Sequence, residues 1–220
     1  PSYWGRAGAS LFDCLELLSL GTNDTISVYD EPLIARMATF IYRTHIDGNW
    51  YVNFADASAR VTPSSYLVYQ FGKRINDPKM QAFGATLISN SEPGSGETLQ
   101  RYLPQLFTED AGQNAAKAIP YESNVWLDQI EVMCAREKEG SPEGFFLGAK
   151  GGHDDESHNH NDIGTFIVYS DGAPLIVDAG VGTYTGQTFS ATRYELFTMR
   201  SAYHNVPTVN GFEQEEGKQY

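Results

Sequence analysis

Cysteine and long apolar runs are scarce in this chain. Its 220 residues include only Cys14 and Cys134, which lie far apart and in segments of different type. Two such cysteines make no disulfide framework and leave the redox compartment of the protein undecided. No run of about 18 apolar residues occurs, so the sequence offers no membrane-spanning helix.

Basic residues are also scarce. Lys and Arg number 15 against 28 Asp and Glu, which gives a formal net charge of −13. Nucleic-acid surfaces require clustered Lys and Arg, so the charge argues against a general DNA or RNA partner. An anionic substrate stays open, because a cleft can be locally basic on an acidic protein.

The chain has neither an initiator methionine nor a signal peptide. It opens on Pro1-Ser2-Tyr3-Trp4, with a helical pattern close behind. We therefore expect a piece of a longer protein, and the missing leader says nothing about its location. Hydrophobic residues make up 41% and aromatic residues 13% of the chain, as in a folded protein with one large core or two smaller ones.

Helical periodicity covers the first part of the chain, residues 1–120. Five helices joined by short connections are expected, which favours antiparallel helical hairpins. They start near Ser10 (with Asp13 as a capping box), Asp30, Thr62-Pro63, Asp77-Pro78 and Leu99, and residues 93–96 form a loop. The first helix is expected to bury Leu11, Cys14, Leu15 and Leu18.

Alternation replaces the helical period in residues 121–220. Strands are expected at about 130–135, 145–149, 163–169 and 175–177, with turns at Asp171-Gly172 and Asn210-Gly211. The fold class is therefore α+β, with a helical domain 1–120 followed by an antiparallel sheet or sandwich domain 121–220. The regular structure of residues 49–59 is not predictable from their pattern.

The most polar stretch is G-G-H-D-D-E-S-H-N-H-N-D at residues 151–162. His158 and His160 are two apart, which in extended backbone places both on one face. A carboxylate or third imidazole would complete a zinc shell, and Asp178 and His204 are candidates downstream. A solvated polar loop is the alternative, and for H-x-H alone it is the stronger one.

The proposed ligands do not converge in a simple hairpin. A hairpin about Asp171-Gly172 pairs Asp178 with a residue near Phe166, which leaves His160 about 20 Å away at about 3.3 Å per residue. The site therefore requires a sharp bend between Asn161 and Gly164, or ligands from non-adjacent strands.

Several stretches together resemble the heparinase II/III-like polysaccharide lyases. They are residues 151–162, Asp178-Ala179-Gly180-Val181-Gly182-Thr183-Tyr184, residues 201–207 and Val209-Asn210-Gly211. The resemblance implies the C-terminal part of an (α/α) toroid followed by an antiparallel β-sheet or β-sandwich domain. It also implies a periplasmic or secreted enzyme, and an anionic polysaccharide substrate such as a glycosaminoglycan of the heparin or heparan sulfate type, or alginate.

The same resemblance assigns roles to individual residues. His160, Asp178 and His204 would bind a structural zinc ion, and His158 would point into the active cleft. Tyr3 is the best match to the family's catalytic tyrosine, with packing at a helix entrance as the alternative. A further Asn or His that neutralises the substrate carboxylate should precede Pro1.

Three functions remain open from the residues themselves. A lyase would use Tyr3 as base, acid or both, with His158 assisting proton transfer or binding the carboxylate. A zinc hydrolase would use an open fourth metal position, and a non-catalytic carbohydrate-binding module would use neither. Arg193 could bind a uronate carboxylate or form an internal salt bridge, and His153 with Asp154 and Asp155 is expected in a solvated loop.

Overall fold

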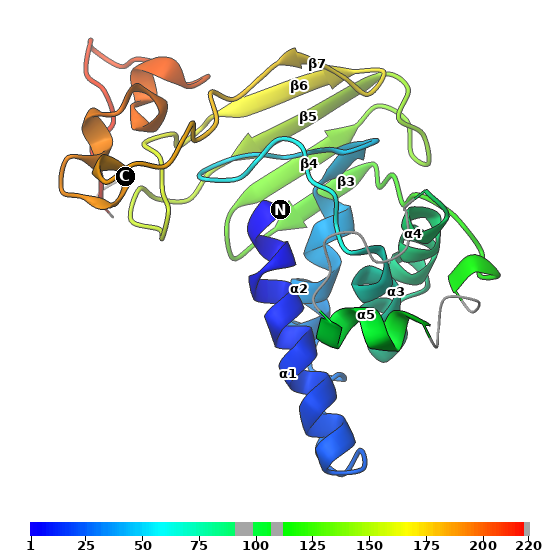
Figure 1. Ribbon diagram of the computed structural model, residues 1–220. Coiled ribbons are helices and arrows are strands. Elements are labelled where there is room, and N and C mark those ends of the chain that lie inside the picture. The colour runs from blue at the N-terminus through cyan, green and yellow to red at the C-terminus, as the bar shows by residue number, and fades with distance from the viewer. Residues whose placement is uncertain (91–98, 107–111, 218–220) are drawn as a thin grey trace. The chain divides into compact units, whose positions relative to one another are not determined.

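The computed structural model describes residues 1–90, 99–106 and 112–217, and its class is α+β, as predicted (Figure 1). It forms two compact units. The first contains Pro1–Arg43 and Thr62–Pro120, and the second contains Thr44–Val61 and Tyr121–Tyr220. A single boundary at residue 120 therefore does not describe the division, because Thr44–Val61 belongs with the second unit.

The first unit is helical. Its elements are a 3₁₀ turn η1 (Ser2–Gly5) and the helices α1 (Ala7–Gly21), α2 (Pro32–Arg43), α3 (Ser65–Arg74), α4 (Pro78–Ser89) and α5 (Leu99–Leu106). The predicted loop 93–96 lies outside the described residues. Among the described residues, no helix has the length and apolar character needed to cross a membrane.

The starts of α3 and α4 follow from side-chain caps. Asp77 accepts a hydrogen bond from the Met80 amide at 2.8 Å, with Pro78 in the first helical turn, as predicted. Helix α3 begins later than expected, because Ser64 rather than Thr62 caps it and accepts from the Leu67 amide at 3.4 Å.

Two expectations for α1 are wrong. The helix begins at Ala7, so Ser10 lies inside it and forms no capping box. The large side chain that α1 buries is Phe12, whose ring lies 5.1 Å from that of Phe71, whereas Cys14 is exposed and Leu18 is 39% exposed. Leucines occur around most of α1, so aromatic partners and not the period select its buried side.

The second unit contains a five-stranded antiparallel sheet in the order β3-β4-β5-β6-β7 (Figure 1). Its strands are β3 (Asn124–Leu127), β4 (Val132–Arg136), β5 (Phe145–Lys150), β6 (Phe166–Ser170) and β7 (Ala173–Ile176). Ile130, expected in a strand, lies in the β3–β4 turn instead. The described residues form this single sheet and one short two-stranded sheet, so they do not make a sandwich.

Segment 44–61 packs against the five-stranded sheet. It begins with the hairpin β1 (His45–Asp47) and β2 (Trp50–Tyr51). The Trp50 ring lies 5.9 Å from the Tyr169 ring of β6. Arg136 of β4 donates to the carbonyls of His45 and Ile46 at 2.6 and 2.7 Å. These contacts explain why a segment from the helical part of the sequence folds with the sheet.

Candidate functional site

The histidine loop, residues 151–165, connects β5 to β6 and contains the bend that the sequence required. The Gly164 amide donates to the Lys150 carbonyl at 2.8 Å, and the Thr165 amide donates to the Asp162 carbonyl at 2.9 Å. Gly164 has a φ of +86°, which a glycine adopts readily. The loop is thereby folded back instead of extending β6.

A buried ion pair fixes this loop from within. The Lys150 ammonium, 3% exposed, lies 2.5 Å from the Asp162 carboxylate and donates to the Asn159 side-chain carbonyl at 3.3 Å. Asp154 was expected in a solvated loop, but it is 1% exposed and accepts a hydrogen bond from the side-chain NH₂ group of Asn159, so that expectation is wrong. Burial raises the pKa of Asp154, partly offset by that hydrogen bond and by the charge of Lys150.

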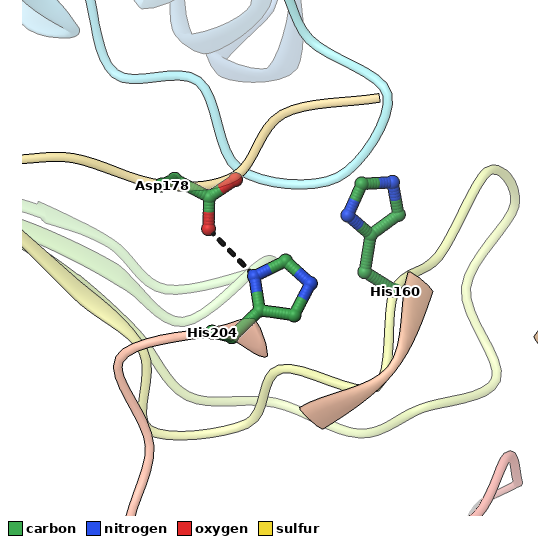
Figure 2. A group of neighbouring side chains, drawn as sticks. All are labelled: His160, Asp178 and His204. Atoms are coloured by element: carbon green, nitrogen blue, oxygen red, sulfur yellow. Dashed lines mark hydrogen bonds and ion pairs between the residues drawn. The ribbon is translucent and has the colours of Figure 1, made fainter. Parts of the chain in front are cut away.

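The bend brings together the three residues proposed as metal ligands. One ligand atom from each of His160, Asp178 and His204 lies within 4.8 Å of the others, and all three residues are buried. They come from three separate segments and converge on one point (Figure 2). His204 Nδ1 lies 2.8 Å from an Asp178 carboxylate oxygen.

Outer contacts orient both imidazoles toward this point. His160 Nε2 lies 3.0 Å from a carboxylate oxygen of Asp56, and His204 Nε2 lies 3.0 Å from the Thr198 carbonyl. Both partners only accept hydrogen bonds, so each Nε2 bears a proton. The lone pair of a neutral His160 is therefore on Nδ1, which is buried and has no hydrogen-bond partner among the described residues.

This donor set suits a zinc ion. Two imidazole nitrogens and one carboxylate are common zinc ligands, and an outer acceptor on each imidazole is typical of such sites. Burial lowers the pKa of His204, but the hydrogen bond and charge of Asp178 outweigh it and raise the pKa. The pocket therefore favours positive charge beside Asp178, as a cation site must.

His158 lies at the edge of this cluster and is partly accessible. Its side chain is 40% exposed, and its Nδ1 lies 2.8 Å from the second carboxylate oxygen of Asp56. The Phe189 ring stands edge-on to the imidazole at 6.4 Å. An imidazole held in this way at the surface can reach a ligand.

Asp56 is the site residue that the sequence did not reveal. It is 4% exposed, and it accepts from four side chains: His158, His160, Tyr184 and Arg193. Burial raises the pKa of Asp56, but the four hydrogen bonds outweigh burial and lower the pKa well below its usual range. No motif surrounds Asp56, and it precedes the histidines by about a hundred residues.

Of the two roles considered for Arg193, the structure contains the internal ion pair. Its guanidinium lies 2.7 Å from Asp56 and also donates to the carbonyls of Asn159 and Thr188 at 2.9 and 3.0 Å. Tyr3 lies in η1 of the first unit and is 42% exposed, and its catalytic role stays a prediction.

The fold and the geometry define a class: an α+β protein whose antiparallel sheet carries a buried His-Asp-His cluster beside an accessible histidine. Residues 145–218 match the C-terminal family of heparinase II/III-like proteins. This part of the chain contains His158 and the three candidate metal ligands, and its match confirms the resemblance found in the sequence.

Two solved structures of heparinase III share the fold. One, with methylated lysines, has a TM-score of 0.66 and 16% identity over 98% of this chain and 29% of its own. The other has a TM-score of 0.65 and 17% identity over 94% of this chain and 31% of its own. The chain thus spans about three tenths of each heparinase. No curated protein sequence matches it.

Proposed function

We propose that this chain is part of a polysaccharide lyase that cleaves uronic-acid-containing anionic polysaccharides by β-elimination, in the periplasm or outside the cell. The match of residues 145–218 to the C-terminal family of heparinase II/III-like proteins supports this proposal. The observation that carries it is His158, which is 40% exposed and held by Asp56 next to the buried cluster. We further propose the toroid for the helical unit, since the two heparinase III structures align over almost the whole chain.

The proposed reaction removes the proton on C5 of the uronate. The C–H electrons form the C4–C5 double bond, the C4–O4 bond breaks, and the leaving O4 takes a proton. The C5 proton becomes acidic enough only when the adjacent carboxylate is neutralised or hydrogen-bonded as charge develops. In this proposal Tyr3 is the base, the acid or both.

In the same proposal His158 assists the proton transfer or binds the substrate carboxylate. Since its Nδ1 proton is directed to Asp56, the lone pair of the neutral ring is on Nε2. Nε2 can accept a proton during the reaction, and the protonated ring can pair with the substrate carboxylate.

The role proposed for zinc is structural. Bound by His160, Asp178 and His204, it would crosslink the histidine loop to the chain after β7 and to the turn at residues 201–204. The burial of all three residues, none more than 7% exposed, favours this role over a hydrolytic zinc, which needs a position open to substrate.

The test uses the full-length protein and a panel of uronate polymers. Lyase products contain an unsaturated uronate that absorbs ultraviolet light, and hydrolase products do not. His158→Ala should lower the rate by about 10²- to 10⁴-fold, the usual contribution of a proton-transfer group. His153→Ala, in the same loop but outside the cluster, should leave the rate unchanged.

The alternatives predict different outcomes. New reducing ends without ultraviolet absorbance would indicate a hydrolase and contradict the proposal. Polymer binding without cleavage, unaffected by His158→Ala, would indicate a carbohydrate-binding module. The role of Tyr3 is tested by Tyr3→Phe in the active protein. This substitution should lower the rate by a similar factor if the Tyr3 hydroxyl transfers the proton.

A further inference from the structure

Asp56 receives hydrogen bonds from three separate parts of the second unit. One carboxylate oxygen accepts from His160 Nε2 at 3.0 Å and from Arg193 Nη2 at 2.7 Å. The other accepts from His158 Nδ1 at 2.8 Å and from the Tyr184 hydroxyl at 2.8 Å. Each carboxylate oxygen therefore accepts two hydrogen bonds, which together occupy its lone pairs.

These contacts impose opposite tautomers on two neighbouring histidines. An ionised carboxylate only accepts hydrogen bonds, so the facing ring nitrogen must bear the proton in each case. His158 is then protonated on Nδ1 and His160 on Nε2. Asp56 thereby leaves the lone pair of His160 on Nδ1, which faces the Asp178–His204 pair. It leaves the lone pair of His158 on Nε2.

The backbone on both sides of this contact is strained. Ala55, just before Asp56, has a φ of +57°, and His158 has a φ of +62°. Non-glycine residues rarely adopt this region, and they persist there where surrounding contacts determine the conformation. The strain is located at the two residues that bring Asp56 and His158 together.

We infer that Asp56 is a positioning residue that links the proposed metal ligand His160 to the proposed catalytic histidine His158. The carboxylate fixes the tautomer and ring orientation of both, while Arg193 balances its charge and Tyr184 completes its hydrogen bonds. The link to His158 rests on the proposed lyase function, whereas the effect on metal binding does not.

Asp56→Asn is the sharpest variant. It keeps the shape of the side chain, but its one acceptor oxygen can serve only one pair of donors, and its NH₂ group faces the other pair. Loss of an outer-shell acceptor typically weakens metal binding by about 10- to 100-fold. We expect such a loss in zinc affinity, measured by competition with a chromophoric chelator on the full-length protein.

A matched control lies in the same segment. Asp47 accepts a hydrogen bond from the Tyr121 hydroxyl and none from the histidines in any contact described above. Asp47→Asn should leave zinc affinity unchanged. If Asp56→Asn binds zinc as tightly as the unaltered protein, the inference is overturned.

A second measurement needs no variant and covers the case in which Asp56→Asn does not fold. Nitrogen-15 NMR of the unaltered protein distinguishes the histidine tautomers. We expect the Nδ1-protonated form for His158 and the Nε2-protonated form for His160, and the reverse assignment of either would refute the inference. Neither measurement uses substrate. If the protein passes both tests but has no lyase activity, the proposed function is disproved and the inference about Asp56 stands.

Discussion

His45 is a buried histidine whose titration should affect stability. Its Nε2 donates to the Gly48 carbonyl at 2.9 Å, and its ring lies 4.9 Å from that of Tyr51. Burial is the largest effect, and with the nearby Arg136 it lowers the pKa of His45 from 6.5 to about 4, although the hydrogen bond to Gly48 opposes the shift. The folded state therefore keeps His45 neutral at a pH where the unfolded chain binds a proton.

The sign of the pH effect follows from this lowered pKa. Below about pH 6.5 the unfolded state gains a proton that the folded state gains only near pH 4, so stability falls across this window by about 3 kcal/mol. We expect His45→Gln, which can still donate to Gly48, to flatten this part of the profile. Urea unfolding between pH 7 and pH 4 measures it, and an equal slope in both proteins would contradict the assignment.

At the scale of residues, local motifs predicted part of the site. The spacing of His158 and His160 indicated a metal site, with Asp178 and His204 as candidates downstream. The structure brings one ligand atom from each of His160, Asp178 and His204 within 4.8 Å of the others. Asp56 was not predictable, because its contacts span more than a hundred residues and its segment has no clear period. Whether the cluster binds zinc remains a prediction.

Helices α3 and α4 approach each other closely at a glycine. A Cβ on Gly84 would lie 2.5 Å from the Tyr69 amide nitrogen and 2.6 Å from the Tyr69 Cα, so backbone would have to move. We expect Gly84→Ala to destabilise the protein by about 1–3 kcal/mol, the usual cost of overpacking.

A glycine at the end of α1 provides the control. A Cβ on Gly21 meets nothing within 4 Å, so Gly21→Ala should be neutral or slightly stabilising. Thermal unfolding of both variants compares them directly. Equal melting temperatures would show that the α3–α4 contact can relax at little cost.

Elements with strong local signals were predicted better than those without. The Asp77-Pro78 start of α4 and the Asp171-Gly172 hairpin were both confirmed, because caps and left-handed turns are decided by a few adjacent residues. The prediction of the buried side of α1 was wrong, because aromatic rings distant in sequence determine which side is buried.

For the whole molecule, removal of the proposed zinc should lower stability. A ligand that binds only the folded state stabilises it by about 4 kcal/mol at a free concentration 1,000 times its dissociation constant. We expect a chelator to lower the melting temperature of the zinc-loaded protein. The His160→Ala variant should have a lower melting temperature before the chelator is added, and the chelator should change it little. A zinc-loaded protein whose melting temperature ignores the chelator would contradict a structural role.

The α+β class, and the position of the five-stranded sheet after the five helices, were predictable from the change in hydrophobic period near residue 121. The assignment of segment 44–61 was not, because its contacts with the sheet, such as that between Trp50 and Tyr169, depend on tertiary packing. The toroid stays a prediction.

The position of segment 44–61 determines how the protein can be divided. If the chain is cut after residue 120, the C-terminal piece retains His158 and the proposed zinc ligands. It loses Asp56, the carboxylate that orients His158 and His160, to the N-terminal piece. A minimal version of the sheet unit would therefore need this segment restored, for example by grafting it ahead of β3 through a linker. Insertions within residues 44–61, although remote in sequence, would act on the histidines as directly as changes in their own loop.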